Sequence, residues 1–480
     1  MNKQLRSGLA ALALTMLGLT GARAQSPGGV AANLKIWLRP ETFTPSSWTD
    51  ASGSGNHFTQ SNAGRQPFLA LPQELYNFNS PVDFGTTGAD ARFMVVPTGR
   101  PYSANGTNST LFTTSVNRNV SGYSDIIGFG ATTTGTGLIN ANTPVYTNLS
   151  SNIVLYPYIT NAGLPQVEVG KMYLNDVSFT VGTAGIKYGQ NGQTGTVNNT
   201  FAAGNAAHAN GAVLGSQPEV RDGLIGEVIA YERDLAEDEK VRVRSYLAIK
   251  YGLTLPHNYV ASNGSTVFWD QTTNNGYNNN IAGIARDAGS LQNQKQSRSV
   301  NDGKQVLIAT TGLADANAAN TTELTDGQFL LWGDNGLAKA PAVALAGPGI
   351  NFRFAAIWKA QNSGSVGTVR VAWPAGLTNL KLIQSSDATI DSSDPATGMT
   401  ATQIVNGVSY NYADVSLADG QFFTFAAFVQ APGGVVANLL MWHKANDGVN
   451  AAGAKNIWKD MSVNGRDVTQ NNNAANQPGL

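Results

Sequence analysis

The sequence predicts an all-β protein with a single strong helix. Thr and aromatic residues, which suit pleated surfaces, are frequent, and Gly- and Asn-rich turns separate the apolar segments. Val369 and Val371 alternate with Arg370 and Ala372, which is the period of two of a strand with one wet face. Long helical patterns are scarce. Hydrophobic residues make up 42% of the chain, so we do not expect disorder throughout.

Residues 1–24 have the pattern of a secretory signal peptide. Lys3 and Arg6 precede an apolar run over residues 9–19, and Ala22 and Ala24 form an Ala-x-Ala cleavage site. The run is too short for a convincing membrane span, so we expect cleavage and no membrane insertion afterwards. The predicted location is therefore secreted or on the cell surface.

Composition narrows the choice of partners. The chain has no cysteine, so its exported domains depend on apolar burial instead of disulfides. Thirty basic residues face thirty-one acidic ones, and charged residues are only 13% of the total. Neither nucleic acid nor an anionic membrane is an expected partner.

An internal repeat defines the domain organisation. Residues 27–39 (PGGVAANLKIWLR) match residues 432–444 (PGGVVANLLMWHK), and residues 48–60 (WTDASGSGNHFTQ) match residues 458–470 (WKDMSVNGRDVTQ). The copies lie about 400 residues apart, which indicates a tandem of whole domains instead of a solenoid. Residues 431–480 are then an incomplete second copy. So short a segment is expected to pack poorly or to borrow strand edges from the preceding domain.

The first complete domain is predicted over residues 25–252. A strand at 222–231 leads into the helix, with Asp234 as its cap and Glu237 three residues later as in a capping box. Gly252 ends the helix. The apolar face of the helix is expected to consist of Val243, Leu247 and Tyr251.

A second β-rich domain is predicted over residues 253–430. Its strand candidates are short apolar segments separated by polar turns. They are residues 305–309, 328–332, 351–358, 368–373, 379–383 and 421–428.

These stretches resemble a known family. Residues 27–41, 48–60 and 226–255 (GEVIAYERDLAEDEKVRVRSYLAIKYGLTL) are similar to the concanavalin A-like, laminin-G-like domain of bacterial surface proteins. Residues 258–427, with FLLWGDNG and IWKAQNSGSVGTVRVAWP, resemble an uncharacterised domain that often follows this module in large secreted adhesin-like proteins. The resemblance implies a laminin-G-like jelly-roll sandwich, a second β-rich domain of unknown role, and the start of another jelly roll. It implies no particular ligand.

We expect no catalytic activity. No histidine lies in a Gly-x-Ser-x-Gly or His-Glu-x-x-His motif, and the Glu-x-Asp-x-Glu string of jelly-roll glycosidases is absent. Glu237, Asp238 and Glu239 are consecutive, so a helix would point them apart. Glu227 and Glu232 flank the final strand of the first domain and are interpreted as non-catalytic.

One turn is a candidate metal site. Asp50, Ser52 and Asn56 form an oxygen-rich Asp-x-Ser-Gly-x-Gly-Asn turn, repeated more weakly at Asp460 and Ser462. Such a turn can hold a structural calcium ion, but Asp and Ser also close turns through their own backbone, and that alternative is favoured. No other cofactor is expected.

The leading functional hypothesis is non-catalytic binding or adhesion through the jelly roll, with an extracellular glycan or surface protein as partner. A structural spacer in a cell-surface stalk is the alternative, and a polysaccharide-acting enzyme is third. The tryptophans could stack on sugars, but apolar neighbours such as Ile36 and Leu38 around Trp37 favour packing in a core.

Overall fold

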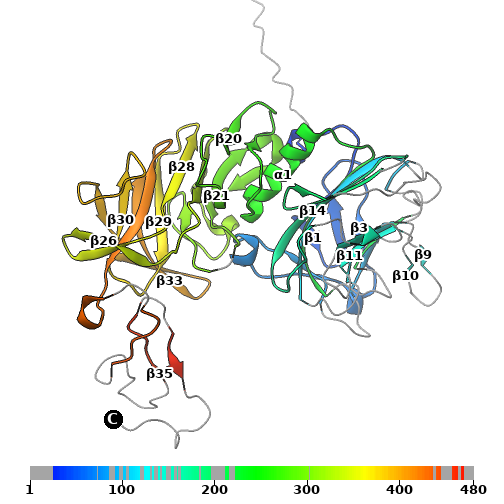
Figure 1. The fold of residues 1–480 in the computed structure, drawn as a ribbon. Coiled ribbons are helices and arrows are strands. Elements are labelled where there is room, and N and C mark those ends of the chain that lie inside the picture. The colour runs from blue at the N-terminus through cyan, green and yellow to red at the C-terminus, as the bar shows by residue number, and fades with distance from the viewer. Residues whose placement is uncertain are drawn as a thin grey trace, which may run out of the picture.

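The structure is a computed structural model in which two β bodies lie side by side with a helix between them (Figure 1). It describes residues 25–72, 74–85, 92–96, 101–103, 107–118, 124–129, 132–133, 139–140, 143–147, 153–155, 159–160, 164–182, 185–195, 211–215, 222–301, 303–435, 439–444, 457–462 and 466–469. The predicted signal peptide, residues 1–24, lies outside these ranges.

The first body is a single antiparallel sheet whose two halves face each other. Its order is β13-β12-β11-β8-β17-β6-β3-β2-β1-β18-β7-β14-β15-β16, with β4 and β5 beside β18. The strands are β1 (Leu34–Thr44), β2 (Ser47–Asp50), β3 (Phe58–Thr59), β4 (Phe68–Leu69), β5 (Val82–Asp83), β6 (Met94–Val96), β7 (Ser109–Asn117), β8 (Ser124–Phe129), β11 (Thr143–Thr147), β12 (Ile153–Leu155), β13 (Ile159–Thr160), β14 (Met172–Phe179), β15 (Ile186–Gln190), β16 (Gln193–Thr194), β17 (Ala212–Leu214) and β18 (Gly223–Tyr231). A separate pair is β9 (Thr132–Thr133) with β10 (Ile139–Asn140).

The two halves enclose one hydrophobic core. Ile36 and Val228 from the β1/β18 half pack in the same cluster as Phe129 and Leu214 from the β8/β17 half. Because side chains alternate along a strand, the neighbouring residues Trp37 and Ile229 point to the opposite face of that half. The first body is therefore a β-sandwich, and one outer face is apolar and needs a further layer.

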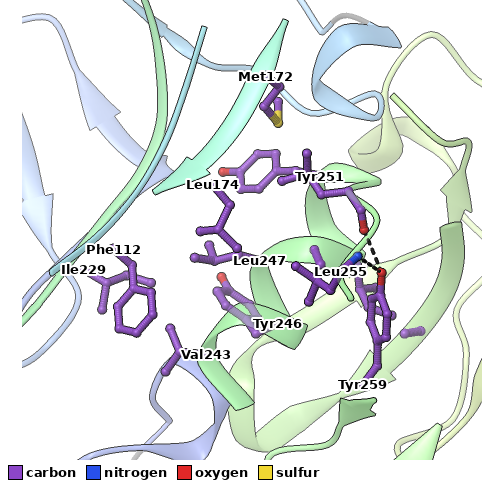
Figure 2. Close-up of a cluster of buried hydrophobic side chains, with 14 of the residues drawn as sticks. Phe112, Met172, Leu174, Ile229, Val243, Tyr246, Leu247, Tyr251, Leu255 and Tyr259 are labelled. Carbon is purple, nitrogen blue, oxygen red and sulfur yellow. Dashed lines mark hydrogen bonds between the residues drawn. The ribbon is translucent and has the colours of Figure 1, made fainter. Parts of the chain in front are cut away.

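Helix α1 (Glu237–Tyr251) supplies that layer. Its predicted apolar face is confirmed, since Val243, Leu247 and Tyr251 are fully buried. Figure 2 shows them against the outer side of the sandwich. The helix ends at Gly252, which has φ 68° and a left-handed conformation that glycine adopts without strain.

The sequence prediction named the wrong residues for the N-terminal cap of α1. Ala236 is the N-cap, and its backbone N–H donates to Glu239 Oε2 at 3.1 Å. Asp234 instead accepts a hydrogen bond from Thr180 Oγ1 at 2.8 Å and pairs with Lys240 at 3.0 Å. The capping carboxylate thus lies two residues later than the sequence spacing suggested.

The second body also has two antiparallel sheets around a core. One contains nine strands and the other five. The first comprises β21 (Asn279–Asp287), β22 (Gln292–Gln294), β25 (Phe329–Asp334), β26 (Pro341–Gly347), β27 (Ile350–Phe354), β28 (Trp358–Ser363), β30 (Thr378–Ser385), β31 (Ala396–Gly398) and β34 (Phe422–Phe428), and the second β23 (Gln296–Ser297), β24 (Leu307–Ala309), β29 (Thr368–Pro374), β32 (Ala401–Val405) and β33 (Val408–Ser416). The strand predicted over 351–358 is wrong as a single element, because the chain turns at Ala355–Ile357 between β27 and β28.

A continuous hydrophobic core joins the two bodies. The cluster that holds α1 also contains Tyr259, Trp269, Ile281 and Phe329, from β19 (Tyr259–Val260), β20 (Val267–Trp269) and the nine-stranded sheet. The helix thus packs against the first sandwich on one side and the second body on the other. The predicted domain boundary at residue 252 stays a prediction, and apolar packing crosses it.

The opening turn of the chain strengthens this junction. Residues Pro27–Gly29 form the turn η1, and Ser26 N donates to Gly289 O at 3.1 Å. A Cβ on Gly28 would lie 2.5 Å from the carbonyl carbon of Arg242, so the helix backbone leaves room only for glycine. The first residues of the sandwich therefore dock on both α1 and the second body.

The second copy repeats the local geometry of the first. Its turn η7 (Pro432–Gly434) has Gly433 at φ 61° and ψ 17°, close to φ 58° and ψ 19° at Gly28. The strands β35 (Ile457–Trp458) and β36 (Val468–Thr469) pair only with each other among the described residues. The predicted borrowing of edges is not seen there.

Candidate functional site

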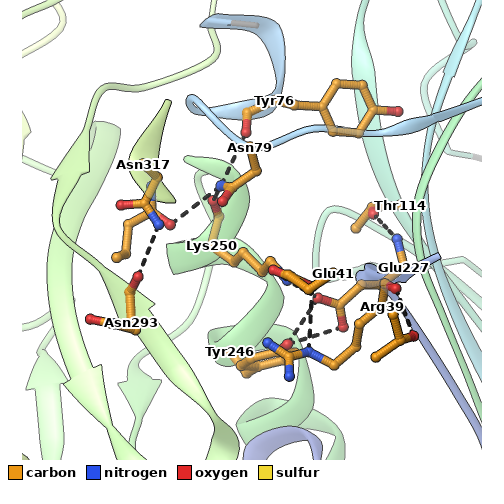
Figure 3. Close-up of polar contacts among 12 residues, drawn as sticks. Arg39, Glu41, Tyr76, Asn79, Thr114, Glu227, Tyr246, Lys250, Asn293 and Asn317 are labelled. Carbon is orange, nitrogen blue, oxygen red and sulfur yellow. Dashed lines mark hydrogen bonds and ion pairs between the residues drawn. The ribbon is translucent and has the colours of Figure 1, made fainter. Parts of the chain in front are cut away.

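A polar pocket lies at the junction of the two bodies. Its volume is about 290 Å³, and its lining combines charged side chains with amides. Strand β1 contributes Arg39 and Glu41, the last turn of α1 contributes Lys250, and β22 contributes Gln292 and Gln294 from the second body. Figure 3 shows the charged groups and several of the amides that surround it. We call it the junction pocket.

Strand alternation places the charged residues there. Trp37, Arg39 and Glu41 lie on one side of β1, so the face that packs on the helix changes from apolar to charged along the strand. Lys250 meets this charged end from the last turn of α1, where a cation also suits the helix dipole. Strand alternation and the position of Lys250 in the helix therefore set which charged groups of the first body reach the pocket.

A fully buried carboxylate holds Lys250 in place. Glu227, in the middle of β18, has no exposed surface, and its Oε1 lies 2.5 Å from Lys250 Nζ. It also accepts hydrogen bonds from Trp37 Nε1 at 3.0 Å and from Tyr246 O–H at 2.9 Å. The expectation that Glu227 flanks the strand was wrong. A charge in the buried run GLIGEVIAY was the signal that it needed a tertiary partner.

Glu41 continues this network to the pocket mouth. Lys250 Nζ lies 2.7 Å from Glu41 Oε1, and Arg39 Nε lies 3.6 Å from Glu41 Oε2. Partial loss of water favours protonation of Glu41, but Lys250 and Arg39 outweigh it and lower its pKa to about 2. Burial opposes the charge on Arg39, but Tyr246 and Glu41 outweigh it, so the pKa of Arg39 is raised.

Some buried polar groups at the junction pocket have no hydrogen bond within the protein. Arg39 Nε is buried without a hydrogen bond, and so is Gln292 Oε1, although the Gln292 side chain lines the pocket. Gln292 is only 4% exposed. By contrast, Gln294 on the same face of β22 donates to Asn77 O at 3.0 Å. Two buried groups therefore retain unused hydrogen-bonding capacity, while their neighbours hold the two bodies together.

The arrangement does not match an acid pair for glycoside hydrolysis. Such a pair flanks a sugar bond, and its general acid has a raised pKa. Here the Lys250 ammonium lies between Glu41 and Glu227, and the pKa of Glu41 is lowered. The two carboxylates therefore share a cation.

The predicted calcium turn is brought together by the fold. Asp50 Oδ1 accepts from Trp37 N and Ser52 N, both at 2.9 Å. Asp50 Oδ2 accepts from Ser52 Oγ at 2.7 Å and from Asn56 N at 3.0 Å. Protein donors thus close this turn, which we call the Asp50 turn. Calcium binding there stays a prediction.

The second copy forms the same turn. Asp460 Oδ1 accepts from Trp442 N at 2.7 Å and Ser462 N at 2.9 Å, and Oδ2 accepts from Ser462 Oγ and Arg466 N. Four hydrogen bonds therefore recur at equivalent positions. No cluster of three or more His, Cys, Asp or Glu side chains suited to a metal occurs among the described residues.

Most of the eight tryptophans occupy hydrophobic cores. Six of them are at most 1% exposed and cannot stack on a sugar at the surface. They are Trp37, Trp48, Trp269, Trp332, Trp358 and Trp373. Among the histidines, His57 Nδ1 accepts from Asp50 N at 3.1 Å, and His208 lies outside the described residues. Sequence reasoning did not find the junction pocket, because its residues come from five separate segments of the chain.

The comparisons with known proteins add one family match. A family model described as "Domain of unknown function (DUF8202)" matches residues 239–421, from within α1 to just before β34. No curated protein matches the chain. No helix of the described residues is long and apolar enough to cross a membrane.

Solved structures resemble the chain only distantly. Domain 4 of AbnA, an extracellular arabinanase from Geobacillus stearothermophilus in complex with arabinotriose, is 15% identical over 44% of this chain and 98% of that one, with a TM-score of 0.32. Trypanosoma rangeli sialidase is 14% identical over 45% of this chain, with a TM-score of 0.30, and the match spans only 32% of the sialidase. An HCR/D mutant is 9% identical over 85% of this chain and 99% of that one, with a TM-score of 0.36.

Proposed function

We propose that the chain is an exported, non-catalytic binding protein that recognises an extracellular glycan through the junction pocket. The observation that carries this proposal is the presence of two buried polar groups without a hydrogen bond, Arg39 Nε and Gln292 Oε1, on side chains that line a pocket of about 290 Å³. A buried polar group without a partner costs about 1–3 kcal/mol. A ligand rich in hydroxyl groups would satisfy both groups.

The position of the pocket supports the proposal. Small-molecule sites occur preferentially where two domains meet, because such sites bring groups from separate segments together. Gln294 hydrogen-bonds to the first body through Asn77, and Asn79 Nδ2 donates to Lys250 O at 2.8 Å. The walls are therefore fixed before a ligand arrives, which lowers the entropic cost of binding.

The proposal includes export and a non-catalytic role. Residues 1–24 have the charge and apolar pattern of a cleaved signal, so we place the mature protein outside the cell or on its surface. The shared Lys250 between Glu41 and Glu227 supports binding over hydrolysis. Nucleic acid is not a proposed partner, since basic and acidic residues balance.

A glycan array with the full chain and its Arg39→Ala variant tests this function. We expect the unaltered chain to bind a set of glycans. The affinity of the variant for these glycans should be at least tenfold lower. Lys187→Met, at an exposed position on β15, is the control that should leave the pattern unchanged. If Arg39→Ala binds every glycan as strongly as the unaltered chain does, the proposal is wrong.

A structural spacer is the second candidate, and the continuous core favours it. The cluster around α1 contains residues of both bodies, so the two would resist bending at their junction. Small-angle scattering of the full chain would show a fixed separation of the bodies at all salt concentrations if this candidate holds. A chain that binds no glycan but keeps that separation would favour the spacer.

A further inference from the structure

We infer that the junction pocket accepts the terminal unit of a neutral sugar chain and rejects acidic sugars. This inference rests on the proposed function and concerns the ligand of that same pocket. It follows from three observations: the pairing of charges, the balance of donors and acceptors, and the depth of the pocket.

Each cation that lines the pocket already has a carboxylate. Lys250 pairs with Glu227 at 2.5 Å, and Arg39 lies 3.6 Å from Glu41. Lys295 pairs with Glu323 at 3.1 Å. Because these cations are balanced, the walls offer no excess positive charge to a carboxylate, sulfate or phosphate on a ligand.

The position of Glu41 adds a repulsive element against acidic sugars. Its side chain is 48% exposed, whereas that of Arg39 is 14% exposed, so an entering ligand meets the carboxylate first. A like charge placed against a competing ligand is a common source of specificity. A sugar hydroxyl, in contrast, can donate to Glu41.

The available groups also call for a ligand that both donates and accepts. Arg39 is a donor only, Glu41 is an acceptor when ionised, and Gln292 Oε1 is an acceptor without a partner. An anion could satisfy Arg39 but has no hydrogen to donate to Gln292 Oε1, which would stay without a partner. Neighbouring hydroxyl groups on a sugar ring can donate to one group and accept from another.

The depth of the pocket limits how much of the chain enters. Exposure falls from the half-exposed Glu41 side chain at the mouth to Gln292, which is 4% exposed. A volume of about 290 Å³ is at the lower end of small-molecule pockets, roughly 300–1,000 Å³. We therefore expect one end unit inside and the remaining units outside.

Titration calorimetry with the full chain tests the inference. The neutral probes are oligosaccharides that end in galactose, glucose, mannose or arabinose, and the acidic probes end in sialic acid or galacturonate. We expect at least one neutral probe to bind, about tenfold weaker with Glu41→Gln, and no acidic probe to bind as well. Gln292→Leu should also weaken the neutral probe, and thermal melts of each variant check folding.

A matched control and two contrary outcomes complete the design. Asp414→Asn makes the same chemical change in an exposed pair with Arg370 on the five-stranded sheet and should leave affinity unchanged. Preferred binding of acidic probes by the unaltered chain, weakened by Gln292→Leu, would overturn this inference but leave glycan binding through the pocket standing. Binding of no probe, or no change with either pocket variant, would overturn both.

Discussion

The Asp50 turn lies within the first sandwich and the junction pocket lies between the two bodies, and these two polar clusters differ in how their hydrogen-bonding groups are satisfied. Every oxygen of the Asp50 carboxylate accepts two hydrogen bonds from the protein. At the junction pocket, Arg39 Nε and Gln292 Oε1 have none. A polar turn can thus be complete in itself, whereas a binding pocket retains unmet hydrogen-bonding capacity.

This difference has consequences for stability. A cluster whose hydrogen bonds are complete stabilises the fold, so its loss should be costly. A cluster kept incomplete should reduce stability, and filling it with apolar atoms should be neutral or favourable. Four substitutions, three of them at residues that line the junction pocket, can sharpen or break the comparison.

Asp50→Ala should have the largest effect. The buried N–H groups of Trp37, Ser52 and Asn56 lose their acceptor, and we expect a fall of about 4 kcal/mol in the free energy of unfolding. Urea denaturation measures it. Asp391→Ala, in a turn of similar hydrogen bonding that is exposed, is the control with a much smaller expected loss. Equal losses at the two positions would contradict the prediction.

Lys250→Met should have the next largest effect. Removing the ammonium leaves the Glu227 carboxylate buried without its cation, and we expect a loss of about 3 kcal/mol in urea denaturation. Adding Glu227→Leu should recover most of this loss, because the uncompensated charge is gone. If the double variant is no more stable than the single one, the pair is not the source of the cost.

Gln292→Leu should stabilise the protein. The change removes a buried acceptor without a partner, and we expect a gain of about 1 kcal/mol together with weaker glycan binding. Thermal denaturation and calorimetry measure the two effects. Gln294→Leu is the matched control and should lose stability, since that side chain bridges the two bodies. If Gln292→Leu lowers stability instead, the pocket would not differ from the Asp50 turn in how its polar groups affect the free energy of unfolding.

Glu41→Gln should have the smallest effect, seen as a weaker dependence of stability on pH. The pKa of Glu41, about 2, lies below its value of about 4.3 in an unfolded chain. Its stabilising contribution is therefore complete above pH 4.3 and is lost as the pH falls towards 2. Melting temperatures measured from pH 6 to pH 2.5 should fall less in the variant than in the unaltered chain. Parallel curves would contradict the assignment.

The periodicity of the sequence predicts the strands of the fold, but it does not predict the corners where one strand ends and the next begins. The strand at 223–231 and the strand at 368–374 occur where alternation or apolar runs predict them. The run 351–358 contains a corner at Ala355–Ile357, held by Ile357 N donating to Asn335 Oδ1 at 3.2 Å. The apolar composition of residues 351–358 continues through the corner. The sequence alone therefore could not show where β27 ends and β28 begins.

The candidate site depends on contacts that no local pattern encodes. The Asp50 turn was found because its groups lie within seven neighbouring positions. The junction pocket joins β1, the end of α1 and β22, and Lys250 meets a carboxylate 209 residues away in Glu41. The isolated charge of Glu227 among the apolar residues of its strand is the sequence signal that could have pointed to this region.

The docked turn at the start of the first sandwich also constrains the order of folding. Gln25 Nε2 donates to Ala288 O, 263 residues further along, and Gly28 packs on the backbone of Arg242. A chain that emerges from its amino end first must leave this segment unpaired until the helix and β21 have formed. Closing so long a loop is slow, so the final docking of residues 25–30 is expected to be a late step on the folding pathway.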